Sequence, residues 1–270
     1  MKILLRITLT ALTFISLFNS SLLAQNESPI TPEQIEPNFL GGLVGIGRND
    51  QLGEMVPDCD TCNFTGGVKF GYTVGASYEM TLNDVFNIGA LGLFSDYGFK
   101  AIYDDWEPVE GISAIDGSKI RHTLKLRHTG DFSLKVLSLV PYVKIKPAEW
   151  LFMRAGVSVG FPLSHKLEHR IELIDKSETL PGDYNVHYEL LNDSLRSGVH
   201  ELNSPIVELF PQIGLVIPLT SEWSLSPQLH YAIPLTNISD SGLDFKISTL
   251  RIMLELRYIV NSKSKIYMKK

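Results

Sequence analysis

Apolar and polar residues alternate along several segments of the chain, and this alternation predicts β-strands. In "VKFGYTVGASYEM", from Val68 to Met80, every second residue is apolar or aromatic, whereas the residues between them are small, polar or charged. A period of two is the pattern of a strand whose two faces lie in different surroundings. Four further segments with the same pattern begin at Leu151, Val207, Trp223 and Leu250.

Three weaker segments raise the number of predicted strands to eight. They are the glycine-rich stretch Phe39–Arg48, the segment Val85–Phe99, and the segment Asp131–Lys146, in which the alternation changes parity near Leu137. An inserted residue shifts the parity of a strand, so we expect a β-bulge at Leu137.

Two prolines, Pro211 and Pro227, fall inside predicted strands. Proline has no N–H to donate to a β-ladder, and a closed barrel has no free edge to accommodate it. We therefore expect bulges at both positions as well.

The connections between the predicted strands are alternately short and long. The short ones contain "TLND", "KPAEW" and "TSEW", and the long ones cover residues 49–66, 100–130, 165–205 and 237–245. Short turns at one rim and long loops at the other are typical of a membrane barrel. The predicted fold class is an all-β, eight-stranded antiparallel up-and-down transmembrane β-barrel.

The apolar face of the strands carries large side chains such as Tyr72, Phe161, Leu229 and Leu254. A barrel of eight strands has room inside only for its own side chains, and small residues fit such a lumen better. We therefore expect the apolar face to contact lipid. The alternative is a soluble exported barrel with an apolar interior.

The larger residues of the polar face carry charges of both signs. Charges enclosed in a barrel must be paired and hydrogen-bonded. The predicted interior network comprises Lys69, Glu79, Arg154, Glu208, His230, Arg251, Glu255 and Arg257. A structural core is one interpretation of this network, and the lining of a pore or proton path is the other.

Aromatic residues flank the short connections. Membrane barrels carry girdles of aromatic side chains at both interfaces with water. The candidates for the turn-side girdle are Tyr78, Phe86, Trp150, Trp223 and Tyr258.

The first residues, "MKILLRITLTALTFISLFNSSLLAQ", predict a signal peptide over 1–24, because two basic residues precede a short apolar run and a small residue at the cut. Residues 25–37 then form a short periplasmic segment, 38–262 the barrel and 263–270 a C-terminal tail. The net charge of −6 and the absence of a basic run argue against a nucleic-acid partner.

Two cysteines, Cys59 and Cys62, form "CDTC" in the first long connection. Outside the cytoplasm this spacing favours a disulfide that ties the loop. Free thiols, and metal or redox chemistry, are the alternatives.

Six of the seven histidines fall in predicted outer loops. They are His122, His128, His165, His169, His187 and His200. Solvated loop residues are the favoured interpretation, and metal capture by "HKLEH", the segment from His165 to His169, is the alternative. A cleaving enzyme that uses Ser164, His165 and Glu168 is a weaker hypothesis, because no strained nucleophile turn is present.

The segments "GGVKFGYTVGASYEMTLND", "LSLVPYVKIKPAEWLFMRAGVSVGFPL" and "LRIMLELRYIV" resemble the PorT-like outer-membrane β-barrels of Bacteroidetes-type bacteria, which are distantly similar to the OmpA transmembrane domain. The resemblance covers roughly Asn38 to Val260. It implies location in the outer membrane and assembly by the insertion machinery, which reads a C-terminal strand ending in an aromatic residue, here Tyr258.

We therefore expect a non-enzymatic platform in the lipid bilayer of the outer membrane, without a cofactor, with a role in an envelope or secretion complex. Long loops commonly carry function, so the loop from His165 to Ser204 is the candidate contact surface. The alternatives are a narrow channel or small-solute transporter, and a surface enzyme that cleaves lipid or peptide.

Overall fold

The computed structural model describes residues 37–56, 63–112, 119–174, 202–240 and 242–260, and all regular structure within these ranges is β. No helix in this part of the chain is long and apolar enough to cross a membrane. The ring of the barrel contains the strands β1 (Asn38–Leu52), β4 (Val68–Thr81), β5 (Phe86–Asp96), β7 (Lys119–Ala148), β8 (Leu151–Leu173), β12 (Trp223–Pro234) and β13 (Lys246–Ile259).

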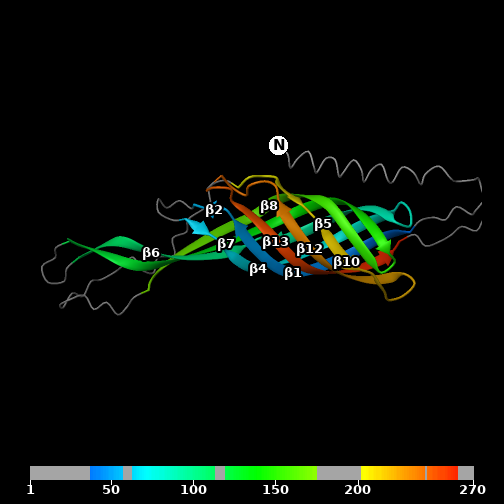
Figure 1. Cartoon of the computed structure of the whole chain (residues 1–270), viewed down its shortest axis with the longest axis horizontal. Coiled ribbons are helices and arrows are strands. Elements are labelled where there is room, and N and C mark those ends of the chain that lie inside the picture. The colour runs from blue at the N-terminus through cyan, green and yellow to red at the C-terminus, as the bar shows by residue number, and fades with distance from the viewer. Residues whose placement is uncertain (1–36, 57–62, 113–118, 175–201, 241, 261–270) are drawn as a thin grey trace, which may run out of the picture. The chain divides into compact units, whose positions relative to one another are not determined.

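The eighth member of the ring, between β8 and β12, is assembled from three short strands. They are β9 (Ile206–Leu209), β10 (Gln212–Leu215) and β11 (Ile217–Pro218). β1 pairs with both β4 and β13, which closes the ring, and every neighbouring pair is antiparallel (Figure 1). The predicted fold class, an eight-stranded antiparallel up-and-down barrel, is confirmed.

The two faces of each strand differ in exposure as the alternation predicts. On the outer surface Phe70 is 78% exposed, Ile46 is 70% exposed and Ile252 is 69% exposed, whereas the residues between the outward positions are largely buried. Tyr72, Leu229 and Leu254 also face outward. The barrel therefore presents a continuous apolar surface to its surroundings and keeps its polar residues inside.

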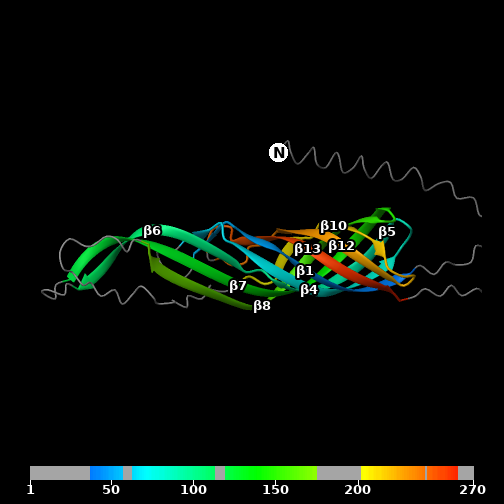
Figure 2. The same cartoon turned by 90° about the horizontal axis from the view of Figure 1, so that it is seen from below.

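The predicted loop over residues 100–130 is wrong. The chain leaves regular strand geometry only at Tyr97–Gly98 and continues in the same direction and register as β6 (Phe99–Ile112), which pairs with the first half of β7, from Phe99 opposite Phe132 to Ile112 opposite Lys119. β8 follows β7 as far as Leu173, so the predicted loop from His165 also begins as a strand. β6, β7 and β8 thus form a sheet that extends past the ring (Figure 2), which we call the outer sheet.

The predicted parity change near Leu137 is also wrong. The even-numbered residues of β7 from Leu124 to Lys144 all point to the buried side. What changes at Leu137 is the chemistry of the outward face. After Leu137 in the sequence the outward residues of β7 are apolar, and before it they are polar, as at Lys135. The register shift belongs to β8, where Lys135 lies opposite Ser164 and Val136 opposite Pro162, so that one residue of β8 is extra.

Neither proline requires a bulge. At Pro211 the chain leaves the ladder only between β9 and β10, and the register with β8 is the same on both sides, with Leu209 opposite Val157 and Gln212 opposite Arg154. Pro227 pairs in register with Leu254 of β13. Its other side faces the gap between β10 and β11, where no N–H is needed.

Candidate functional site

The lumen is filled with side chains in layers that differ in chemistry from one end to the other. We call the end with the short turns and with Asn38 and Ile259 the turn side, and the opposite end the loop side. The loop side is closed by an apolar cluster, the loop-side plug. Its buried members are Met55, Phe64, Tyr97, Phe99, Ala101, Phe132, Leu134, Val136, Leu167, Ile206, Ile238, Phe245 and Ile247.

The loop-side plug is completed by a small hairpin of β2 (Glu54–Met55) and β3 (Phe64–Thr65). The Gln51 side chain holds this hairpin, since its Nε2 donates to the Phe64 carbonyl at 2.6 Å and its Oε1 accepts from the Gly67 N–H at 3.0 Å. Glu54 N donates to the carbonyl of Leu243, which joins the hairpin to the connection between β12 and β13. The hairpin and this connection therefore cover the strand residues of the plug together.

Beneath the plug lies a layer of polar residues centred on Arg251. Its guanidinium donates to Asn49 Oδ1 at 3.0 Å and to the Asp96 carbonyl at 2.7 Å. The hydroxyl of Tyr97 donates to the Glu208 carboxylate at 2.8 Å. A Cβ on Gly47, which lies opposite Arg251 on β1, would sit 2.0 Å from the Leu250 carbonyl oxygen and 2.9 Å from Arg251 Cγ, so the close approach of β13 requires glycine there.

His230 belongs to the same region and stacks on Phe210, with 3.8 Å between the ring centroids. Neither of its ring nitrogens has a hydrogen-bond partner within the described chain. This histidine therefore packs as an aromatic ring rather than joining a hydrogen-bond network.

The turn-side half of the lumen holds a network around Glu79, which is 1% exposed. This carboxylate accepts hydrogen bonds from Lys144 Nζ at 3.0 Å and from Arg154 at 3.3 Å, and it also accepts from Arg257. Tyr142 and Asn87 donate to it as well, at 3.0 and 2.6 Å. One carboxylate thus serves three cations, and we call this group the Glu79 network.

A second carboxylate, Glu255, completes the Glu79 network. It accepts from Arg154 at 2.9 Å and from the Ser77 hydroxyl. Arg154 also lies over the ring of Tyr142, with 4.5 Å from guanidinium to centroid. These contacts supply the pairing that buried charges require.

The structure places seven of the eight predicted interior residues inside the barrel, but in two separate layers rather than one network. Lys69 is the exception, because it pairs with Asp131 at 2.6 Å near the loop-side rim, and both side chains are more than a third exposed. Lys144 and Tyr142 were missed. Both occupy even positions of β7, which point to the buried side along its described length.

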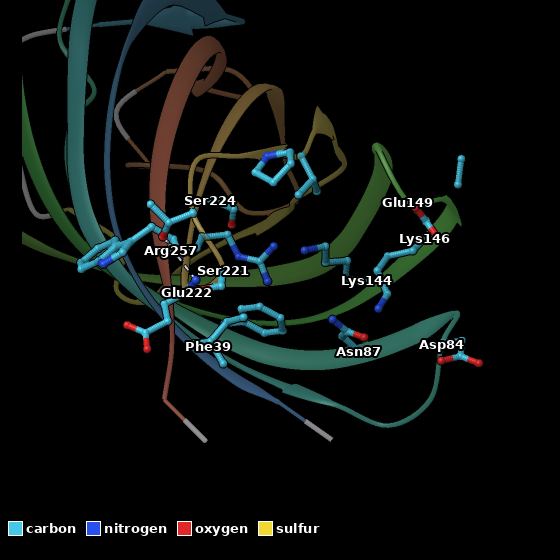
Figure 3. Close-up of a pocket in the computed structure, with 16 residues that line it drawn as sticks. Phe39, Asp84, Asn87, Lys144, Lys146, Glu149, Ser221, Glu222, Ser224 and Arg257 are labelled. Carbon is cyan, nitrogen blue, oxygen red and sulfur yellow. Dashed lines mark hydrogen bonds between the residues drawn. The ribbon is translucent and has the colours of Figure 1, made fainter. Parts of the chain in front are cut away.

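At the turn side the lumen opens into a cavity of about 790 Å³, which we call the turn-side cavity. Lys144 and Arg257 point toward one another at its inner end, close to Asn87 and Phe39 (Figure 3). Asp84, Glu149 and Glu222 lie around it on the short turns, and all three are exposed. The cavity therefore has a cationic inner end and acidic margins.

The predicted girdle residues lie at this same end of the barrel. Trp150 is 61% exposed and Trp223 is 41% exposed, and the Trp223 ring packs against Tyr258 with 4.9 Å between centroids. Tyr78 also faces outward, and Phe86 is half-buried.

Two histidines predicted to be solvated are buried instead. His128 and His169 are each 1% exposed, and His128 Nδ1 lies 3.1 Å from His169 Nε2 inside the outer sheet. Tyr103 stacks on His128, and Phe64 of the plug contacts His169 edge-on at 5.4 Å. The predicted loops are strands here, and their inward positions are covered by the β2–β3 hairpin.

The remaining candidates that the structure describes, around His165, do not come together as a site. His165 is exposed while His169 is buried, so "HKLEH" does not present a metal-binding pair. Ser164 and His165 are adjacent residues of a strand, and Glu168 pairs with Lys166. Cys59, Cys62, His187 and His200 lie outside the described residues, as does the side chain of His122.

No protein-family model and no curated protein matches the chain. Similar solved structures include Ail, the attachment invasion locus protein of Yersinia pestis, at 12% identity and a TM-score of 0.31, covering 83% of this chain and 99% of that one. Neisserial surface protein A gives 8% identity and a TM-score of 0.32, covering 82% and 96%. The outer membrane protease OmpT from Escherichia coli gives 8% and 0.31, covering 87% and 100%. Overlap at this level assigns no function, and the barrel is established by its own strand pairing.

Proposed function

We propose that this chain is a bacterial outer-membrane β-barrel of the PorT-like kind, with the turn side in the periplasm. The outward residues support this proposal. On β7 they are apolar from Leu137 to Ile145, and about ten tilted residues suffice to cross the hydrocarbon. A closed ring leaves no unpaired edge in the membrane, which is the condition for a sheet to span it.

We further propose that the barrel is a non-enzymatic platform. The observation that carries this proposal is the closed lumen: within the described residues, the loop-side plug, the layer around Arg251 and the Glu79 network follow one another from the loop-side rim to the turn-side cavity. A filled lumen gives no path for solute. Within the described residues, the chemistry of the lumen is that of paired charges and packed rings.

The outer sheet is the part of the platform best suited to contact a partner. Beyond the apolar band, β7 pairs with β6 over 14 residues, from Phe132 to Lys119, which corresponds to roughly 45 Å of strand. The outward residues of β7 in this part are polar and charged, and Arg127 pairs with Asp104 of β6, which supports a solvent-exposed position. We propose that the outer sheet contacts a partner in an envelope or secretion complex.

Two measurements on the refolded protein test the proposal. We expect faster gel migration in SDS before boiling than after it, because an intact membrane barrel resists the detergent. In planar bilayers we expect no steady conductance. A stable open conductance would replace the platform with a channel, and turnover of lipid or peptide that is lost on His165→Ala would replace it with an enzyme.

A further inference from the structure

The turn-side cavity has the features of a binding site that the platform role does not use. Its volume of about 790 Å³ falls in the range of about 300–1,000 Å³ that is typical of small-ligand pockets. The cavity is bounded by residues of the described chain from β1, β5, β7, β12 and β13. The site is therefore built on the rigid ring and not on the outer connections.

The inner end of the cavity is cationic. Lys144, Arg154 and Arg257 face only two carboxylates, Glu79 and Glu255, so the Glu79 network carries a formal excess of one positive charge. Lys144 and Arg257 are the members of this network that line the cavity, and Lys146 adds a third cation beside them. An anionic group at this end would balance the excess.

Two buried polar atoms next to these cations also favour a ligand. Asn87 is 1% exposed and Arg257 is 3% exposed, and both line the cavity. Within the described chain, Asn87 Oδ1 and Arg257 Nε have no hydrogen-bond partner. Buried donors and acceptors are normally satisfied. Arg257 Nε can donate to a carboxyl group of a ligand, whereas Asn87 Oδ1 can only accept and calls for a donor group of the ligand.

The walls and margins define the rest of the ligand. Phe39, Trp223, Val216 and Ile259 provide apolar surface along the cavity. The exposed acids Asp84, Glu149 and Glu222 stand at its margin (Figure 3). These acids repel a purely anionic molecule and favour one whose outer end is cationic.

From this arrangement we propose that the turn-side cavity binds the carboxyl terminus of a short peptide, with the carboxylate at Lys144 and Arg257, apolar side chains along Phe39 and Trp223, and an amino group at the acidic margin. The acidic margin argues against an anionic lipid as the occupant. This binding does not depend on the closed lumen, so a barrel that conducts ions could still show it, and a silent barrel could lack it.

The test is calorimetric titration of the full chain, refolded in a neutral detergent, with the tripeptide Lys-Ala-Val and with its carboxy-amidated form. We expect the free acid to bind at least tenfold more tightly than the amide, because only the acid carries the anionic head. Equal binding of both forms, or no binding of either at millimolar concentration, overturns the proposal. Binding of dodecanoate without binding of the tripeptide overturns it in favour of a lipid.

Variants locate the binding. Lys146→Gln leaves the Glu79 network intact and should weaken binding of the acid about fivefold, whereas Ser224→Phe fills the cavity and should abolish it. Lys166→Gln, an exposed residue on β8 toward the opposite end, is the matched control and should leave binding unchanged. Each variant must first show the heat-dependent gel shift of the folded barrel. Undiminished binding by the folded Ser224→Phe variant would contradict the assignment to this cavity.

Discussion

The two ends of the lumen achieve closure by different means. The loop side is closed by packing of apolar side chains, among them Phe99, Phe132 and Phe245, whose rings lie 5.2 to 5.9 Å apart. The turn side is closed by hydrogen-bonded charges around Glu79. In an apolar core, removing a side chain lowers the stability in proportion to the volume removed. In a buried charge network, removing one charge leaves its partners uncompensated, so the whole network is destabilised.

The plug and the Glu79 network also differ in the surroundings that we expect for them. The plug is covered by the β2–β3 hairpin and by the connection between β12 and β13, so it resembles the core of a soluble protein. The Glu79 network lies within the apolar band, where the outer surface cannot carry charge and polar residues have only the lumen to occupy. A single chain thus has its apolar residues inside at one level and outside at another.

The largest effect is expected from Glu79→Gln. The neutral side chain would leave Lys144, Arg154 and Arg257 with only Glu255 to balance them, and breaking a buried ion pair in this way costs about 3–5 kcal/mol. Urea unfolding in lipid vesicles measures the loss. The exposed Glu149→Gln is the control, and a cost below about 1 kcal/mol for Glu79→Gln would show that the charges do not act as a unit.

A smaller loss is expected in the plug. Leu134→Ala removes a fully buried side chain and should lower the free energy of unfolding by about 2–5 kcal/mol, depending on how far its neighbours relax. Leu139→Ala makes the same chemical change on the outward face of the same strand, where the side chain is 57% exposed. If both variants lose the same stability, the plug is not a packed core.

The outward face can be tested with charge. Leu139→Arg places a cation within the apolar band of β7 and should cost about 2–4 kcal/mol in vesicles. Ser133→Arg makes an outward change of the same charge on the polar part of β7. It should fall within about 0.5 kcal/mol of the unmodified chain, as surface substitutions usually do. Equal tolerance at the two positions would place both in water.

The smallest effect is expected at the buried histidines of the outer sheet. Burial, and then the neighbouring His128, lower the pKa of His169 from its ordinary 6.5, so folding favours the neutral ring. This contribution is present above pH 6.5 and is lost as the pH falls below that value toward the lowered pKa of the folded state. Tyr103 and Glu107 of β6 and Phe64 of β3 face the pair, with Glu107 3.1 Å from His128 Nε2.

Hydrogen exchange of residues 99–132 measures this dependence. After correction for the intrinsic pH dependence of amide exchange, we expect lower protection factors at pH 5.5 than at pH 7.5 in the outer sheet and unchanged protection factors in the ring. In His169→Gln the difference should disappear. A pH response that persists in this variant would assign it to other groups.

The sequence predicted the ring well, because lipid on one side and a polar lumen on the other impose opposite chemistry on alternate residues of β4, β8, β12 and β13. The prediction from the sequence fails beyond the apolar band, where the outside is no longer apolar and the inside is no longer polar. Before Leu137 the interior becomes apolar and the exterior polar, so the buried Phe132, Leu134 and Val136 of β7 imitate a change of parity. The alternation does not predict β6, because outside the band its outward residues are mixed, with the polar Asp104 between the apolar Ile102 and Trp106.

The internal contacts could be predicted only in part. Alternation places Glu79 and Arg154 on the lumen side, but it does not show that one carboxylate meets three cations from β7, β8 and β13. His128 and His169 lie 41 residues apart and meet through the β7–β8 register. Such register depends on the β8 bulge beside Ser164, for which the sequence has no distinct pattern.

The membrane barrel requires that the apolar outer face contacts lipid, and the fluorescence of a single tryptophan on that face measures this contact directly. Trp106, Trp150 and Trp223 are replaced by Phe, Leu139 is replaced by Trp, and the protein is refolded into vesicles. Because Leu139 is exposed on the apolar outer face, we expect its fluorescence to be quenched strongly by lipids brominated along the acyl chains and weakly by aqueous acrylamide. Strong quenching by acrylamide with no effect of the brominated lipids would place this face in water and contradict the membrane barrel.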